Sequence, residues 1–140
     1  MAQTDNIKRK LAAILSADVQ GYSRLMGDDG MATIRTLTTY RKLMSRIIQE
    51  HSGRVVDSPG DNLLAEFSSA VDAVQCAVEV QTELAIRNAE LPEDRQIHYR
   101  IGGNVGDVIV EDERIYRIYG DGVNIAARLE SLADGGGICI

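Results

Sequence analysis

The chain has 140 residues, 44% of them apolar, which suffices for one hydrophobic core and is too little for two domains of ordinary size. Its 15 basic and 21 acidic residues give a net charge of −6, which argues against the positive field that holds nucleic acid. We interpret residues 1–10 as a lead-in and 11–140 as one domain. Without a signal-peptide pattern or an apolar stretch of membrane-spanning length, we expect a cytoplasmic protein with no membrane or nucleic-acid partner.

The first half of the chain combines short apolar runs with one long amphipathic stretch. Residues 11–17 form an apolar run that predicts a buried strand. From 28 to 51, apolar residues recur at three- and four-residue intervals, which predicts a long helix. Two short runs, 54–57 and 63–67, flank the sequence Ser58-Pro59-Gly60-Asp61, whose proline and glycine suit a type II turn. The pattern predicts a hairpin after the helix.

The second half begins with an amphipathic helix over residues 69–89. Its expected buried stripe consists of Ala70, Val71, Val74, Ala77, Val78 and Leu84. A strand follows at 99–110, and its glycines at 102, 103 and 106 indicate an edge, a bend or the close approach of a ligand. A short strand at 115–119, a third helix from 121 to about 132 and a final strand at 138–140 complete the chain.

The resulting element order is β-α-β-β-α-β followed by β-α-β. We therefore predict an α+β fold of the ferredoxin-like type, with an antiparallel sheet, helices on one face and an additional β-α-β segment. Many unrelated proteins share this arrangement, so the function has to be argued from particular side chains.

Two aspartates stand where neighbouring strands of such a sheet would end. Asp18 follows the first strand and Asp61 lies in the hairpin turn, so their carboxylates can converge. A hard cation such as Mg²⁺ prefers a few carboxylates together with phosphate oxygens and water. The backbone N–H groups of Gly21, Tyr22 and Ser23, at a loop-to-helix transition, suit phosphate. Either aspartate taken alone is better explained as a cap or turn former.

Asn124 and Arg128 are four residues apart in the third predicted helix and therefore lie on one face of it. In such a pair, Arg128 can stabilise a phosphoryl group in transfer and Asn124 can hold a sugar oxygen. The alternative is a solvated helix face on which Arg128 pairs with Glu130 or Asp134.

Three segments then resemble, in order and spacing, the signature segments of the class III adenylate and guanylate cyclases. They are SADVQGYSRLM at 16–26, GRVVDSPGDNLLAEF at 53–67 and IYGDGVNIAARLESLA at 118–133. The resemblance covers nearly the whole chain. It implies an enzyme that turns a nucleoside triphosphate into a 3′,5′-cyclic monophosphate and pyrophosphate, by in-line attack of the ribose 3′-hydroxyl on the α-phosphorus.

The family's site residues carry over to matching positions. The resemblance implies that Asp18 and Asp61 bind two Mg²⁺ or Mn²⁺ ions, with the backbone carbonyl of Val19 as a further ligand. It implies that Asn124 orients the ribose and that Arg128 stabilises the transition state. Family members place the aspartates and the Asn/Arg pair on opposite protomers, which implies a homodimer with its sites at the interface.

The positions that select the base depart from the adenylate cyclase pattern. Where those enzymes usually have a lysine and an aspartate, this chain has Asp57 and Arg117, so the expected charges are inverted. Guanylate cyclases have an acid at the first position, which suits guanine N1–H, and Arg117 can donate to O6. ATP remains the default substrate and GTP a competitor. Alternatively, Asp57 and Arg117 pair with each other or with solvent and leave base recognition loose.

The resemblance also implies that the family's catalytic domain continues beyond the segment matching residues 135–140 of this chain. The continuation adds the final strands and a lysine that contacts the triphosphate, so we expect weak or no activity from this chain alone. The alternative function is a non-catalytic cyclase-like module for dimerisation or nucleotide sensing. A diguanylate cyclase is disfavoured because no GGDEF-like hairpin replaces the SPGDN turn.

Overall fold

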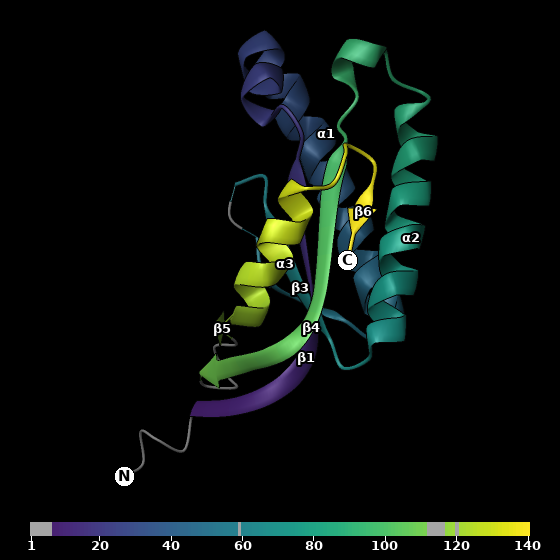
Figure 1. Cartoon of the computed structure of the whole chain (residues 1–140). Helices are drawn as coiled ribbons and strands as arrows, with labels where there is room; N and C mark the ends of the chain where they lie inside the picture. The colour runs from purple at the N-terminus through teal and green to yellow at the C-terminus, as the bar shows by residue number, and fades with distance from the viewer. Residues whose placement is uncertain (1–6, 59, 112–116, 120) are drawn as a thin grey trace.

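The structure is a computed structural model of the chain, and it describes residues 7–58, 60–111, 117–119 and 121–140. Figure 1 shows one sheet with the two long helices on one side and a shorter helix on the other. The elements are β1 (Ile7–Val19), α1 (Tyr22–Glu50), β2 (Arg54–Asp57), β3 (Leu63–Phe67), α2 (Ala70–Asn88), the short 3₁₀ helix η2 (Glu93–Arg95), β4 (Tyr99–Glu111), β5 (Arg117–Tyr119), α3 (Asp121–Ser131) and β6 (Ile138–Cys139).

The sheet has the strand order β2-β3-β1-β4-β5, and each of these neighbouring pairs is antiparallel. Together with the element order, this confirms the ferredoxin-like α+β prediction. The additional segment differs in two ways from the rest of the fold. Strand β6 pairs parallel to β4, and α3 packs on β1 and β4 from the face opposite α1 and α2. Strand β1 also begins at Ile7, inside the predicted lead-in.

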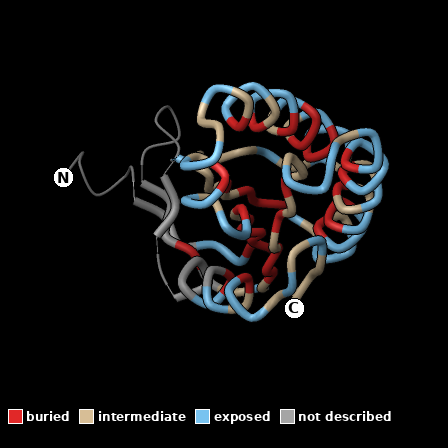
Figure 2. The backbone as a smooth tube through the Cα atoms, turned by 90° about the horizontal axis from the view of Figure 1, so that it is seen from above, coloured by how far each residue is buried: buried red, intermediate tan, exposed pale blue. Residues whose placement is uncertain are grey.

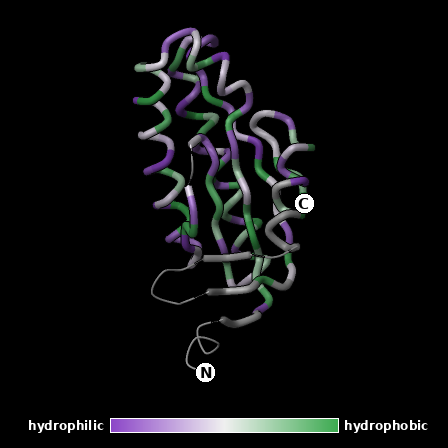
Figure 3. Tube along the Cα trace, turned by 90° about the vertical axis from the view of Figure 1, so that its left-hand side faces the viewer, coloured by the Kyte–Doolittle hydropathy of each residue, from purple (hydrophilic) through white to green (hydrophobic). Residues whose placement is uncertain are grey.

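The middle of strand β1, from Ala12 to Leu15, is apolar because it is covered on both faces. Successive strand side chains point to opposite faces of a sheet. Leu15 and Ala17 therefore join the core beneath α1 and α2, whereas Ala12 and Ile14 join the smaller core beneath α3. Seen from above in Figure 2, the buried segments lie at the centre between the helices, and Figure 3 shows the apolar stretches along these strands.

Helix α1 begins at Tyr22, several residues before the predicted start at 28. The helical path is interrupted at Asp29, whose φ of −159° and ψ of 94° are extended. The Asp29 side chain accepts a hydrogen bond of 3.1 Å from the N–H of Ala32 and so caps the longer second part. Within the described ranges, no helix combines the length and the apolar character needed to cross a membrane.

The hairpin of β2 and β3 follows the prediction closely. Gly60 has a φ of 56°, the left-handed conformation that glycine adopts without strain, while Pro59 lies outside the described residues. The pairing of the two strands shifts register between Val55 and Asp57, a bulge that increases local twist. The sheet curls enough for β2 to approach β5, although they stand at opposite ends of the strand order.

Gly102 explains why glycines interrupt β4. A Cβ atom there would collide with the backbone nitrogen of Glu130 and the carbonyl oxygen of Ala126, so α3 lies directly on the strand. The close approach that the sequence indicated is that of a helix rather than a ligand.

Replacing Gly102 by alanine should therefore separate α3 from β4 and lower the free energy of unfolding by about 1–3 kcal/mol. Urea denaturation followed by circular dichroism measures the change. Gly27→Ala is the matched control, because a Cβ there meets nothing within 4 Å. Its helical position should make it neutral or stabilising by up to about 1 kcal/mol. Equal stabilities of the two variants would contradict the prediction.

Candidate active site

The end of β1 and the beginnings of β3 and β4 lie together at the edge of the sheet where its strands begin and end. Because β1 is antiparallel to both β3 and β4, the last residues of β1 lie beside the first residues of those two strands. Asp18 is directly opposite Arg100, and Val19 is opposite Tyr99. Residues that are more than 80 positions apart in sequence thereby share one site.

The structure brings Asp18 and Asp61 together. The N–H of Val19, the residue after Asp18, donates a hydrogen bond of 3.2 Å to Oδ2 of Asp61. Asp18 and Asp61 are both partly exposed, and the charges of both act on the pKa of Glu130 and of Tyr99, so the two residues lie in one neighbourhood that solvent reaches. The contact brings the two residues to the same end of the sheet, as the sequence predicted, and their role in holding a metal-triphosphate complex stays a prediction.

Arg100 closes on Asp18 in a bidentate ion pair. Its Nε donates to Asp18 Oδ1 at 3.0 Å, and its Nη2 donates to Oδ2 at 3.0 Å. A planar guanidinium fits both oxygens of a carboxylate, and such pairs are among the stronger polar contacts in proteins. Sequence reasoning missed Arg100, because only the register of β1 against β4 reveals that it faces Asp18.

Glu130 of α3 is the third carboxylate at this edge and is 4% exposed. Its Oε2 lies 3.8 Å from Nη2 of Arg100. The pKa of Glu130 is raised to about 7, first by burial and then by the charge of the adjacent Asp18 carboxylate and a hydrogen bond shared with it, while Arg100 opposes the shift. Glu130 therefore faces Asp18 and Arg100, and the alternative in which it pairs with Arg128 on a solvated face does not hold for it.

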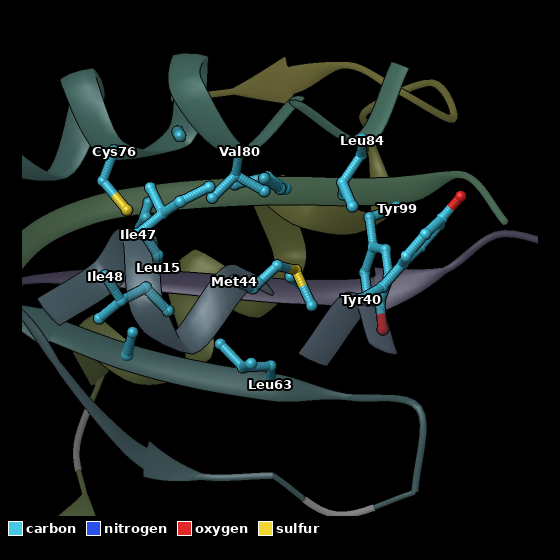
Figure 4. Close-up of a cluster of buried hydrophobic side chains, with 14 of the residues drawn as sticks. Leu15, Tyr40, Met44, Ile47, Ile48, Leu63, Cys76, Val80, Leu84 and Tyr99 are labelled. Atoms are coloured by element: carbon cyan, nitrogen blue, oxygen red, sulfur yellow. The ribbon is translucent and has the colours of Figure 1, made fainter. Parts of the chain in front are cut away.

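Tyr99 and Arg41 lie beneath the two aspartates. The Tyr99 side chain is 1% exposed and belongs to the core cluster drawn in Figure 4. Burial raises the pKa of Tyr99, with the Arg41 guanidinium opposing and Asp61 and Asp18 adding to the effect. Among the described residues, the Tyr99 hydroxyl and two Arg41 nitrogens, Nε and Nη2, are buried without a hydrogen-bond partner. Tyr99 is thus a neutral, buried side chain close to the two aspartates.

The start of α1 lies next to Asp18 in sequence. Gly21 precedes the helix with a φ of 69°, in the left-handed region, and Tyr22 and Ser23 form the beginning of the first turn. This turn contains no acidic residue and no side chain caps it. Free backbone N–H groups and the positive end of the helix dipole favour an anion at such a place.

Helix α3 carries Asn124 and Arg128 one turn apart, as predicted. The Arg128 side chain is exposed, while the side chain of Asn124 lies outside what the structure describes. Glu130 is two residues beyond Arg128, which is about 200° around the helix, so the two side chains leave α3 in nearly opposite directions. Arg128 consequently points away from the Asp18 of its own chain.

The two positions expected to select the base lie on strands at opposite ends of the strand order. Asp57 ends β2 and is exposed, and its Oδ1 accepts a hydrogen bond of 2.9 Å from the N–H of Ser58. Arg117 begins β5, and its side chain lies outside the described part of the chain. The approach of β2 to β5 nevertheless brings the two backbones into one region.

The donor set at the sheet edge fits a hard divalent cation. In the part of the chain that the structure describes, no three histidine, cysteine or acidic side chains form a group that could hold a metal ion by themselves. Two adjacent carboxylates that leave several coordination positions to phosphate and water are typical of Mg²⁺ sites in phosphoryl transfer. A cation bound to Asp18 would compete with the bidentate contact of Arg100 for the same two carboxylate oxygens.

Comparison with known proteins decides the family. The family model described as the adenylate and guanylate cyclase catalytic domain matches residues 6–140. The chain belongs to this family. Class III cyclases are enzymes, and the resemblance of the three signature segments is thereby confirmed.

Individual relatives agree with the assignment. The chain is 48% identical over 137 residues to "Putative adenylate cyclase 3" of Rhizobium meliloti, covering 97% of this chain and 23% of that protein. The chain thus spans less than a quarter of this relative. The crystal structure of an adenylate/guanylate cyclase/hydrolase from Silicibacter pomeroyi matches with a TM-score of 0.86 and 41% identity, covering 95% of this chain and 76% of that one. The guanylyl cyclase Cya2 matches with a TM-score of 0.82 and 28% identity, covering 94% and 74%.

The raised pKa of Glu130 makes a prediction about this cyclase domain's stability. Between about pH 4.5 and pH 7, the folded state holds a proton on Glu130 that the unfolded chain releases, so stability falls as pH rises through this window. Glu130→Gln replaces the carboxyl group by a neutral isostere that does not titrate, so its free energy of unfolding should not fall through this pH window. The variant should match the wild type near pH 4.5 and exceed its free energy of unfolding by about 1–3 kcal/mol at pH 8. Urea denaturation without divalent cations tests this, and parallel pH curves for the two proteins would refute it.

Proposed function

We propose that the protein converts a nucleoside triphosphate into the 3′,5′-cyclic monophosphate and pyrophosphate, as a homodimer with its sites at the interface. The observation that carries the proposal is the adjacency of Asp18 and Asp61, joined through the N–H of Val19, in a chain of the cyclase family. Two metal-binding carboxylates are what in-line attack on a triphosphate needs from one subunit.

Asp18, Asp61 and the Val19 carbonyl would hold the metal ions. Two Mg²⁺ or Mn²⁺ ions would neutralise phosphate charge and lower the pKa of the ribose 3′-hydroxyl. The first turn of α1, with Gly21 and its successors, would donate backbone N–H groups to phosphate oxygens. These residues bind and orient the triphosphate so that the 3′-hydroxyl and the leaving pyrophosphate stand in line.

Arg100 would exchange partners during binding. In the free protein its guanidinium neutralises Asp18 at 3.0 Å. When that carboxylate turns to a divalent cation, the guanidinium is released at the position where the phosphates of the same complex arrive. An arginine suits a phosphate as well as it suits a carboxylate, so the exchange keeps its charge paired throughout.

Asn124 and Arg128 would act on the site of the second subunit. Arg128 is exposed and leaves α3 on the side opposite Glu130, which faces the Asp18 of the same chain. One subunit therefore supplies carboxylates and the other an amide and a guanidinium. A single subunit should be inactive, and a symmetric dimer should carry two equivalent sites.

ATP is the default substrate of this proposal and GTP its competitor. A relative at 48% identity is named as an adenylate cyclase, and a structure at 28% identity is a guanylyl cyclase. The exposed Asp57 carboxylate accepts hydrogen bonds, which matches the donors of guanine better than adenine N1.

The direct test is long incubation of the protein with ATP, GTP, CTP or UTP and Mg²⁺ or Mn²⁺, followed by identification of the products by mass spectrometry. A 3′,5′-cyclic monophosphate and pyrophosphate are expected from ATP, GTP or both. Calorimetry with the same nucleotides should show that triphosphate binding requires the divalent cation. If no product forms and no metal-dependent binding is seen, the proposal is contradicted and the non-catalytic, dimerising module is favoured.

A shared site predicts complementation between inactive variants. Asp18→Ala and Arg128→Ala should each lose at least about 100-fold in turnover, because each removes a charge that acts on the reacting phosphate. Mixed in equal amounts, the two variants form some heterodimers with one intact site, so part of the wild-type rate should return. A mixture no more active than its components would exclude a site built across two subunits.

Base selection is tested by restoring the usual adenylate cyclase residue. Asp57→Lys should shift the ratio of kcat/KM for ATP over GTP towards ATP by about tenfold or more, because one correctly placed hydrogen bond changes specificity by that amount. Asp72→Lys, which adds the same charge on α2, is the control and should leave the ratio unchanged. An unaltered ratio in Asp57→Lys would favour loose base recognition.

A further inference from the structure

Glu130 has no task in the reaction outlined above, yet it is the most deeply buried carboxylate at the site. It is 4% exposed, and within the described part of the chain it lies close to Asp18, Asp61 and the guanidinium of Arg100. A buried carboxylate is costly unless it is paired, and a methionine or leucine of similar size would pack there without that cost. The position therefore calls for an explanation beyond packing.

Arg100 contacts two carboxylates through the same nitrogen. Its Nη2 contacts Asp18 at 3.0 Å and Glu130 Oε2 at 3.8 Å. The first distance is that of a hydrogen bond and the second that of a looser ion pair. In the free protein Arg100 is thus hydrogen-bonded to Asp18, while Glu130 makes a longer contact with the same nitrogen.

Glu130 is held in place more firmly than either partner. Its own backbone nitrogen lies against Gly102, two residues after Arg100 on β4, where no Cβ would fit. Asp18 and Arg100 have side chains that are 22% and 27% exposed, against 5% for the side chain of Glu130. Of Glu130, Asp18 and Arg100, the buried Glu130 carboxylate is therefore the one with the least freedom to move.

We infer that Glu130 is a positioning residue for Arg100, holding its guanidinium over the site when Asp18 is taken up by a metal ion. The inference rests on the proposed function. Once Asp18 has turned to the metal, a partly exposed arginine without Glu130 is free to swing into solvent, and ordering it again weakens its contact with phosphate. With Glu130 present, a small movement of the Arg100 guanidinium exchanges Asp18 for Glu130 as its carboxylate partner. The remaining N–H donors of Arg100 then face the triphosphate.

The test is a double-mutant cycle on triphosphate binding. Isothermal titration calorimetry with Mg²⁺ and the non-cyclisable α,β-methylene analogues of ATP and GTP measures affinity for the wild type, Glu130→Gln, Arg100→Ala and the double variant. Glu130→Met is a second probe of the same position that fills a similar volume. Glu50→Gln, at an exposed carboxylate ending α1, is the matched control. Urea denaturation of every variant confirms that it is folded.

Glu130→Gln should weaken binding of the analogue by about tenfold in the wild-type background, the order expected for one charge-assisted contact. In the Arg100→Ala background the same change should cost less than about twofold, because the residue through which it acts is gone. Glu130→Met should behave as Glu130→Gln does, and Glu50→Gln should bind as the wild type.

The outcomes separate this inference from the proposed function. Absence of Mg²⁺-dependent binding by the wild type would overturn both. Binding by the wild type with equal affinity for Glu130→Gln would overturn the positioning role alone. Equal losses in the two Arg100 backgrounds would show that Glu130 acts on structure or on the metal directly, and would also overturn it.

Discussion

The ion pair between Asp18 and Arg100 is the contact on which the site depends. It exists because β1 and β4 pair in one register over their full described length, which sets these two residues opposite each other at the open end of the sheet. A slip by one residue would turn every side chain of the strand to the other face. The apolar faces of β1, buried under α1 and α2 on one side and α3 on the other, make such a slip costly. The core therefore determines the polar geometry at the site.

The charges at this edge do not balance within the subunit. Asp18 and Glu130 contact the guanidinium of Arg100, Asp61 and Arg41 lie nearby, and the raised pKa of Glu130 reflects burial first and then this excess of negative charge. Partial neutralisation by a proton is one answer to such an excess, and divalent cations that arrive with a triphosphate are another. The free protein thus has a site whose electrostatics favour the cationic part of the proposed substrate complex.

The sequence predicted where the helices and strands lie more accurately than which of their faces are buried. Periodicity located helix α2, but Val71, Val74 and Val78 of its expected stripe are exposed, because small residues such as Ala73 and Cys76 pack most closely against the sheet. The aspartates were found because they end strands and match a family segment. Arg100 and Glu130 were not, since an arginine in a strand and a glutamate in a helix are ordinary residues until strand register and helix docking place them together.

Helix α3 links the part of the site built in one subunit to the part proposed for its partner. Glu130 contacts Arg100 beside Asp18 of its own chain, while Arg128 leaves the helix on the opposite side. Close contact at Gly102 prevents α3 from moving without β4, and β4 carries Arg100. In the proposed dimer, a change of partner by Arg100 would therefore act on the helix whose other side carries Arg128, the group proposed for the second site.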